Sequence, residues 1–175
     1  SNIIGTEVAA KAPADGYSLY IGTTSSLSVV PHLYSKLPFD AERDFAPVSL
    51  LGVLNTGLIA TPGVEARDAR ALIAALKARP DSVAVATAGI GSYSHLSALW
   101  FNSAAGVKTN LVPYNSSSPY VDLIAGQVQL MFDGLPAAAG NIHTGKLRLL
   151  AITGKERAPS FPDVPTFAEA GLPDY

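Results

Sequence analysis

The chain has 175 residues, of which 48% are hydrophobic and 15% are charged, and its formal net charge is −2. This composition is typical of a folded domain with a substantial core and excludes a disordered or strongly charged chain. The small net charge gives no reason to expect nucleic acid as a partner. Cysteine is absent, which excludes disulfides, thiolate nucleophiles and cysteine-ligated zinc.

The N-terminal third predicts short segments separated by proline and glycine. The chain opens in what looks like the middle of a helix, and neither a signal peptide nor a membrane-spanning apolar run is present. We therefore expect both ends of a longer protein to be missing. A short strand over 18–21 is followed by a hydroxyl-rich turn. Pro31 and Pro38 are expected to break the next helical turns, and residues 45–62 suit two extended segments.

The rest of the chain alternates between helix and strand patterns. Residues 65–80 carry apolar side chains at the spacing of an amphipathic helix. Apolar runs predict strands over 83–88, 109–114, 128–133 and 147–154. Between them, helices are predicted over 93–106, 118–127 and 135–145. This alternation predicts an α/β fold with a parallel sheet covered on both faces.

Two further expectations concern packing and the C-terminal tail. In the predicted helix 93–106, Leu96, Leu99 and Trp100 are expected to share one face. Trp100, Phe101 and Met131 are expected in the core. Four prolines make residues 155–175 an irregular surface segment, with one short helix over 166–170.

The stretch "VAVATAGIGSYSHLSALW" (83–100) runs from a strand through a glycine-rich turn into a helix. It resembles a dinucleotide fingerprint, but Ser94 stands in place of the third glycine. No Asp or Glu lies between Asp81 and Asp122 to hold a ribose, and no G-K-[ST] follows. Both absences argue against a nucleotide.

A catalytic serine is the second interpretation of this turn. Neither Ser92 nor Ser94 has the G-x-S-x-G frame of a nucleophile elbow. His95 lies three residues after Ser92, within one helical turn, but local Ser/His pairs are more often caps than catalytic dyads. A Ser/His-dependent hydrolase of α/β fold is kept as an alternative.

The third interpretation is an anion site at the start of the helix. Unpaired N–H groups and the positive end of the helix dipole attract anions there. Gly89 and Gly91 allow close approach of the backbone to a ligand, Ser92 and Ser94 add hydroxyl donors, and Tyr93 could form a wall. A carboxylate suits such a site. The structural alternative, that Ser92 only caps the helix, stays equally open at this point.

Similar hydroxyl-rich turns follow two other predicted strands, at 22–28 and 114–120. Because ligands bind outside the carboxyl ends of strands in open α/β sheets, these turns are candidates for the same site. Asp133 ends the predicted strand 128–133 and could accept from a ligand hydroxyl or ammonium, although capping the next helix is the simpler role. The spacing of the histidines and acids predicts no metal site, and no cofactor is expected.

Four segments together resemble one family in the same order along the chain. They are residues 5–52, "ATAGIGSYSHLSALWF" (86–101), "VPYNSSSPYVDLIAGQVQLMFDGLPAA" (112–138) and "GKLRLLAITGKERAPSFPDVPTFAEAGLPDY" (145–175). The family is that of the tripartite tricarboxylate transporter substrate-binding proteins, also called Bug proteins. The resemblance covers essentially the whole chain.

The resemblance implies a periplasmic-binding-protein fold with two domains that close on a small carboxylate, such as a di- or tricarboxylate, an amino acid or an aromatic acid. It implies no enzyme activity, a periplasmic location and delivery of the ligand to membrane transporter subunits. Asn115 departs from the Lys of many relatives, beside Ser116 in place of Gly. The implied ligand-binding residues are Gly89, Gly91, Ser92, Tyr93, Ser94, His95, Thr23, Thr24, Ser25 and Asp133.

The resemblance also implies a division of the chain. Residues 1–63 correspond to part of a first domain, 64–154 to the second domain, and 155–175 to a return segment towards the first. The first strand and loop of the family, which supply half of the ligand cradle, are expected to be missing. An α/β interaction domain that has lost its ligand with that half is therefore the second alternative.

Overall fold

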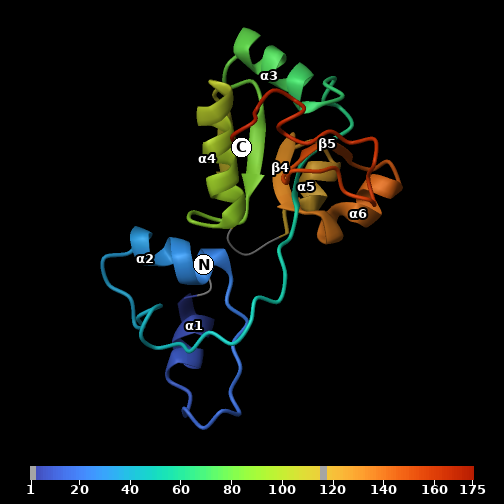
Figure 1. Cartoon of the computed structure of the whole chain (residues 1–175). Helices are drawn as coiled ribbons and strands as arrows, with labels where there is room; N and C mark the ends of the chain where they lie inside the picture. The colour runs from blue at the N-terminus through green and yellow to red at the C-terminus, as the bar shows by residue number, and fades with distance from the viewer. Residues whose placement is uncertain (1–2, 115–117) are drawn as a thin grey trace. The chain divides into compact units, whose positions relative to one another are not determined.

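The computed structural model describes residues 3–114 and 118–175, and these fall into two compact units (Figure 1). Unit 1 runs to Gly52 and includes Ile90–Tyr93. Unit 2 comprises Val53–Gly89 and Ser94–Tyr175. Each unit is described by itself.

Unit 1 is mostly irregular, with α1 (Ile3–Ala10), a π-helical turn η1 (Ser25–Val29) and α2 (Val30–Leu33). The prediction that Pro31 breaks the helix was wrong. Pro31 lies in the first turn of α2, where a missing N–H costs nothing. The predicted strand 18–21 is also absent. Leu19 and Ile21 are exposed there, because no other extended segment of the described chain pairs with 18–21.

Across the described residues, unit 2 contains a mixed sheet in the order β3-β2-β4-β1-β5. Its strands are β1 (Thr56–Ala60), β2 (Ala84–Thr87), β3 (Asn110–Pro113), β4 (Leu130–Gly134) and β5 (Arg148–Ile152). β2 runs parallel to β3 and β4, whereas β1 is antiparallel to both β4 and β5. The predicted α/β fold is confirmed, and the sheet is parallel as predicted except for β1, which runs antiparallel to its neighbours.

The direction of β1 could not be predicted from its residues. Every residue of Thr56–Ala60 is buried, so the strand shows no alternation of buried and exposed residues that would indicate its direction. Only the pairing of Leu58 with Phe132 of β4 and with Ala151 of β5 shows that β1 opposes its neighbours. The first half of the predicted extended segment 45–62 forms no strand and is largely exposed.

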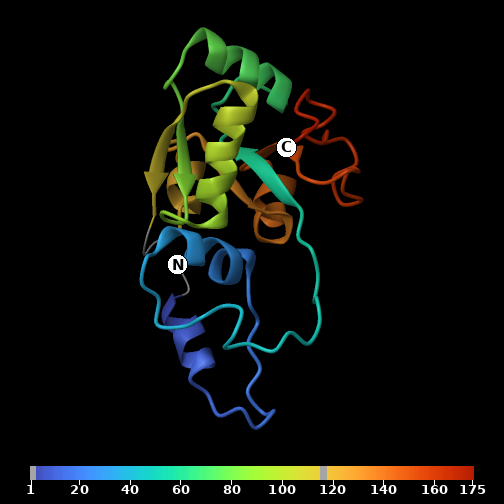
Figure 2. The same ribbon diagram turned by 60° about the vertical axis from the view of Figure 1, so that its left-hand side comes forward.

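Helices cover both faces of this sheet, as predicted, and Figure 2 shows them on its two sides. They are α3 (Ala69–Ala78), α4 (Tyr93–Ala105), α5 (Tyr120–Ile124) and α6 (Leu135–His143). Along β4, Leu130 and Phe132 pack with α3 and α4, whereas Met131 packs with α5 and α6. Two apolar cores therefore hold the central strand from opposite sides.

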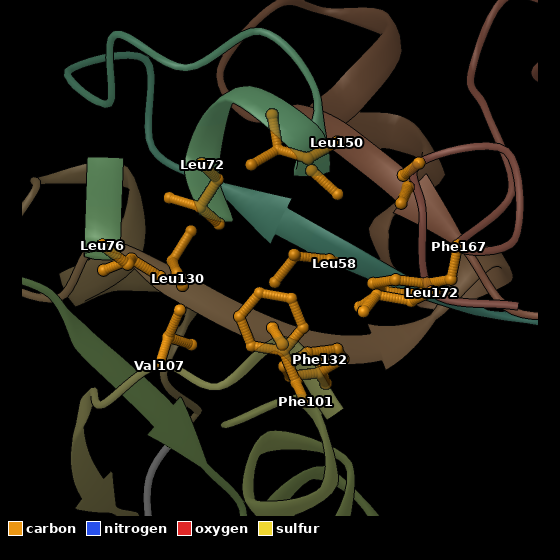
Figure 3. Packing of buried hydrophobic residues seen from close by; sticks show 14 of the residues in the cluster. Leu58, Leu72, Leu76, Phe101, Val107, Leu130, Phe132, Leu150, Phe167 and Leu172 are labelled. Atoms are coloured by element: carbon orange, nitrogen blue, oxygen red, sulfur yellow. The ribbon is translucent and has the colours of Figure 1, made fainter. Parts of the chain in front are cut away.

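The C-terminal tail completes the core beneath α4. Phe167 stacks on Phe132 with ring centroids 6.2 Å apart, and Leu172 joins the same cluster (Figure 3). The short helix predicted over 166–170 is a single closed turn instead. The N–H of Thr166 donates to Glu169 Oε2 (2.8 Å) and the N–H of Glu169 donates to Thr166 Oγ1 (3.2 Å). Gly171 then turns the chain at φ +97°, which ends the turn.

The buried face of α4 differs from the predicted one. Ser94, Ser97, Ala98 and Phe101 face the core, whereas Trp100 is 55% exposed. Small residues on the inner face let the helix approach the sheet closely, and the larger Leu99 and Trp100 are therefore outside. The predicted burial of Phe101 and Met131 is confirmed, and that of Trp100 was wrong.

The neighbours Phe101 and Trp100 provide a matched test of this packing. We expect Phe101→Ala to lower the free energy of unfolding by about 3–5 kcal/mol, since it opens a cavity among Phe132 and Phe167. Trp100→Ala should lower the free energy of unfolding by only about 1 kcal/mol, the contribution of its aromatic contact with Tyr175. Urea denaturation measures both. Equal losses would contradict the assignment of the inner face.

Candidate functional site

The turn from β2 to α4 brings a strand end against the start of a 13-residue helix. Gly89 (φ +97°) and Gly91 (φ +76°) adopt backbone conformations that side chains with a Cβ rarely reach. The N–H of Ala88 donates to Ser94 Oγ at 2.9 Å, which ties the strand end to the first turn of α4. The residues predicted for the anion site thus form one tight turn at the amino end of α4.

Ser94 and Tyr93 contribute to this turn in different ways. Ser94 is 6% exposed, and its hydroxyl oxygen accepts the Ala88 N–H, so it shapes the turn. Tyr93 and Ile90 are exposed at 44% and 67%. His95 follows on α4 and is partly buried. Gly91 and Tyr93 lie in the segment Ile90–Tyr93, which belongs to unit 1.

Thr87, the last residue of β2, lies directly before this turn. It is fully buried, and its hydroxyl has no hydrogen-bond partner within residues 3–114 and 118–175. Its carbonyl accepts from the N–H of Tyr114 at 2.8 Å, which joins the ends of β2 and β3. A buried hydroxyl without a partner costs free energy, so Thr87 is a polar group that the core packing alone does not explain. The sequence analysis did not single it out.

Asp133 lies at the same edge of the sheet, near the end of β4. Val85 and Ala86 of β2 pair in parallel with Leu130 and Met131 of β4. Continuing this register places Ala88 level with Asp133 on the neighbouring strand. The structure therefore brings together the glycine turn and the one acid predicted for the site.

Both carboxylate oxygens of Asp133 accept hydrogen bonds. Tyr120 on α5 donates its hydroxyl to Oδ2 at 2.7 Å, and the N–H of Gly134 donates to Oδ1 at 2.8 Å. Asp133 does not cap α6, because the N-cap of that helix is Gly134, which has no side-chain cap. The simpler role favoured from sequence was therefore wrong. Tyr120 was missed, since a tyrosine after a proline carries no recognisable signal.

Burial raises the pKa of Tyr120 far above its usual value, and the hydrogen bond to Asp133 raises it further. Tyr120 therefore stays protonated and keeps donating at every physiological pH. Asp133 takes part in none of the ion pairs found within the described residues, which are Lys11–Glu7, Arg43–Asp40 and Arg157–Glu169. Its two carboxylate oxygens accept instead from neutral donors, the Tyr120 hydroxyl and the Gly134 N–H.

The predicted residues of unit 1 form a helix start of their own. The N–H of Thr23 donates to Ser26 Oγ (3.0 Å), and the N–H of Ser26 donates to Thr23 Oγ1 (3.3 Å). Thr23 and Thr24 are exposed, Ser25 is partly buried and Ser26 is buried. The hydroxyl oxygen of Thr23 thus accepts from the N–H of Ser26 in the first turn of η1. Asn115 and Ser116 of the third hydroxyl-rich turn lie outside the described residues.

Other kinds of site find no support in the part of the chain that the structure describes. No group of three or more His, Asp or Glu residues there could hold a metal ion. His32 lies on α2 in unit 1, and His143 at the end of α6 stacks on Phe161. In the same residues, no helix is long and apolar enough to cross a bilayer.

Two of the surface hollows within the described residues are well defined. One of about 390 Å³ is lined by Pro62, Arg148 and neighbouring residues. It follows the end of β1 and precedes β5, which places it at the opposite edge of the sheet from Asp133. The other, of about 860 Å³, is formed within residues 27–44 of unit 1. Neither is lined by a residue predicted for the site.

Comparison with known proteins gives a consistent result. A family model described as the tripartite tricarboxylate transporter family receptor matches residues 1–175. Protein BugT of Bordetella pertussis is 39% identical over 175 residues, covering 99% of this chain and 54% of the relative. The chain spans about half the length of the curated relatives it matches.

Solved structures of similar proteins agree over the whole chain. R. palustris Rpa4515 with adipate superposes with a TM-score of 0.91 at 34% identity, covering 99% of this chain and 58% of that one. MatC from Rhodopseudomonas palustris with bound malate gives a TM-score of 0.84 at 32% identity, covering 98% and 58%.

The hydrogen bond that closes the glycine turn can be tested through stability. We expect Ser94→Ala to lower the free energy of unfolding by about 1–2 kcal/mol, because the Ala88 N–H loses its acceptor. Ser103→Ala on the exposed face of the same helix should change it by less than about 0.5 kcal/mol. Chemical denaturation compares the two. A Ser94→Ala variant as stable as the control would show that the bond contributes nothing.

Proposed function

The chain belongs to the tripartite tricarboxylate transporter receptor family, and we propose that it binds a small carboxylate as part of a solute receptor. The carboxylate binds at the glycine turn between β2 and α4. The receptor holds its ligand in the periplasm and passes it to the membrane subunits of a transporter. Binding of this kind involves no catalytic step, so the Ser92 and His95 side chains act as binding groups.

One observation carries the proposal: the turn presents the start of a long helix, framed by two positive-φ glycines, at the carboxyl edge of the sheet. N–H groups at a helix start have no partner inside the helix, and the helix dipole adds partial positive charge there. Glycines let a ligand oxygen come close to those N–H groups. Residues 82–121 contain no Asp or Glu to oppose a bound anion.

The ligand class follows from the same chemistry. A carboxylate is planar and accepts two or more hydrogen bonds, which suits the N–H groups and serine hydroxyls of one turn. Relatives with similar structures are described with adipate and with malate, both small dicarboxylates. We therefore place the ligand of this chain among small carboxylic acids of that size.

The domain organisation supports a receptor that closes around its ligand. We propose that 1–63 contributes to a first domain, 64–154 forms the second and 155–175 leads back towards the first. The two compact units divide earlier, between Gly52 and Val53, so β1 of this 1–63 segment lies in the unit 2 sheet. Thr23, Thr24 and Ser25 belong to unit 1, as do Ile90–Tyr93 of the glycine turn, whereas Gly89, Ser94 and Asp133 belong to unit 2.

Removing both serine hydroxyls tests the proposed function. In the full-length gene product, the double variant Ser92→Ala with Ser94→Ala should bind adipate or malate about tenfold more weakly, because the carboxylate loses hydroxyl donors. Isothermal titration calorimetry well below the melting temperature separates this loss from the lower stability of the Ser94 variant. Ser103→Ala serves as the matched control. Unchanged affinity in the double variant would contradict the proposed site.

A further inference from the structure

The Asp133 carboxylate is a fixed hydrogen-bond acceptor at the carboxyl edge of the unit 2 sheet. Its two oxygens accept from the Tyr120 hydroxyl and from the N–H of Gly134. A carboxylate has about four acceptor positions, so two remain for other donors. Within the described chain, no Lys, Arg or His forms an ion pair with it. Asp133 is thus oriented by neutral donors and has spare acceptor capacity.

The same carboxylate lies one strand away from the glycine turn. The β2–β4 register puts Ala88 level with Asp133, and paired strands are about 4.8 Å apart. A small ligand whose carboxylate is held at the turn therefore lies at the same edge of the sheet as Asp133, one strand away from it. Thr87, whose buried hydroxyl has no partner among the described residues, precedes Ala88 at this same edge.

We propose that Asp133 determines specificity by selecting ligands with a hydroxyl or ammonium group on the carbon next to the bound carboxylate. The inference rests on the proposed function, since it takes the carboxylate to be bound at the turn. A hydroxyl or ammonium at that carbon donates to Asp133. A plain methylene cannot, and it leaves the partly buried charge desolvated without a new bond. A second carboxylate there would meet a like charge.

Tyr120 acts in this selection as a positioning residue. It lies on α5, on the face of the sheet opposite to α4, and its hydroxyl reaches the Asp133 carboxylate from there. Removing this hydroxyl frees one carboxylate oxygen and lets the side chain rotate. A second pair of the same kind, Tyr114 donating to Asp122 at 2.6 Å, provides a matched comparison.

The experiment uses probe acids that differ by one hydroxyl group. Calorimetric titrations of the full-length gene product compare malate, as each enantiomer, with succinate, and 3-phenyllactate with 3-phenylpropionate. We expect the hydroxy acid of at least one pair to bind about tenfold more tightly than its partner, the gain from a hydrogen bond to a charged group.

Variants assign this preference to Asp133. Asp133→Ala should bring the two affinities of the pair to within about twofold, because the hydroxy acid loses its acceptor and the plain acid no longer desolvates a charge. Asp133→Asn, which keeps the shape, should retain part of the preference through its amide oxygen. Tyr120→Phe should weaken the hydroxy acid and leave the plain acid unchanged, whereas a folding defect would weaken both. Asp122→Asn changes the comparison pair, and this variant should keep the wild-type ratio of affinities for the hydroxy acid and the plain acid.

The outcomes separate the two proposals. Equal and measurable binding of hydroxy and plain acids by the wild type would overturn the inference and leave the proposed function standing. An Asp133→Ala variant that weakens both members of a pair equally would also overturn it, since Asp133 would then only support the fold. If neither adipate nor any acid of the two pairs binds the wild-type protein, the proposed function itself fails.

Discussion

The parallel pairing of β2 with β4 is the constraint on which the rest of the structure depends. β4 is the central strand of the unit 2 sheet, and its residues Leu130, Met131 and Phe132 are buried alternately in two cores. A shift of one residue would exchange these faces, so the register is strongly specified. Because β2 and β4 run in the same direction, their carboxyl ends meet at one edge. The glycine turn and Asp133 are neighbours for that reason.

The polar groups at this edge differ in how well the fold satisfies them. Ser94 accepts the Ala88 N–H and Asp133 accepts from two donors, so both are held in one orientation. The hydroxyl of Thr87 has no such partner in the described chain. An edge with oriented donors and acceptors suits recognition of a small polar molecule, since little ordering is left to be done when the ligand arrives.

The two units differ in how they use their apolar residues. Unit 2 buries its large side chains in two continuous clusters, and the C-terminal tail adds Phe161 to one and Phe167 to the other. Unit 1 exposes several large apolar side chains along its extended segments, among them Tyr17, Leu19, Val48 and Leu50. The stability of the described chain therefore comes mainly from unit 2, which also contains Asp133 and the two ends of the glycine turn, Gly89 and Ser94.

The sequence by itself determined the α/β class, the places of β2 to β5, helix α3 and the glycine turn before α4. These features depend on local periodicity and on glycine geometry, which neighbouring residues specify. Only the tertiary structure decided that β1 opposes its neighbours, that Trp100 is outside and that Tyr120 holds Asp133. A strand buried on both faces has no directional pattern, and a helix face rich in small residues gives a weak apolar signal. The Tyr120–Asp133 bond joins residues on a helix and a strand, so it exists only once α5 packs on the sheet.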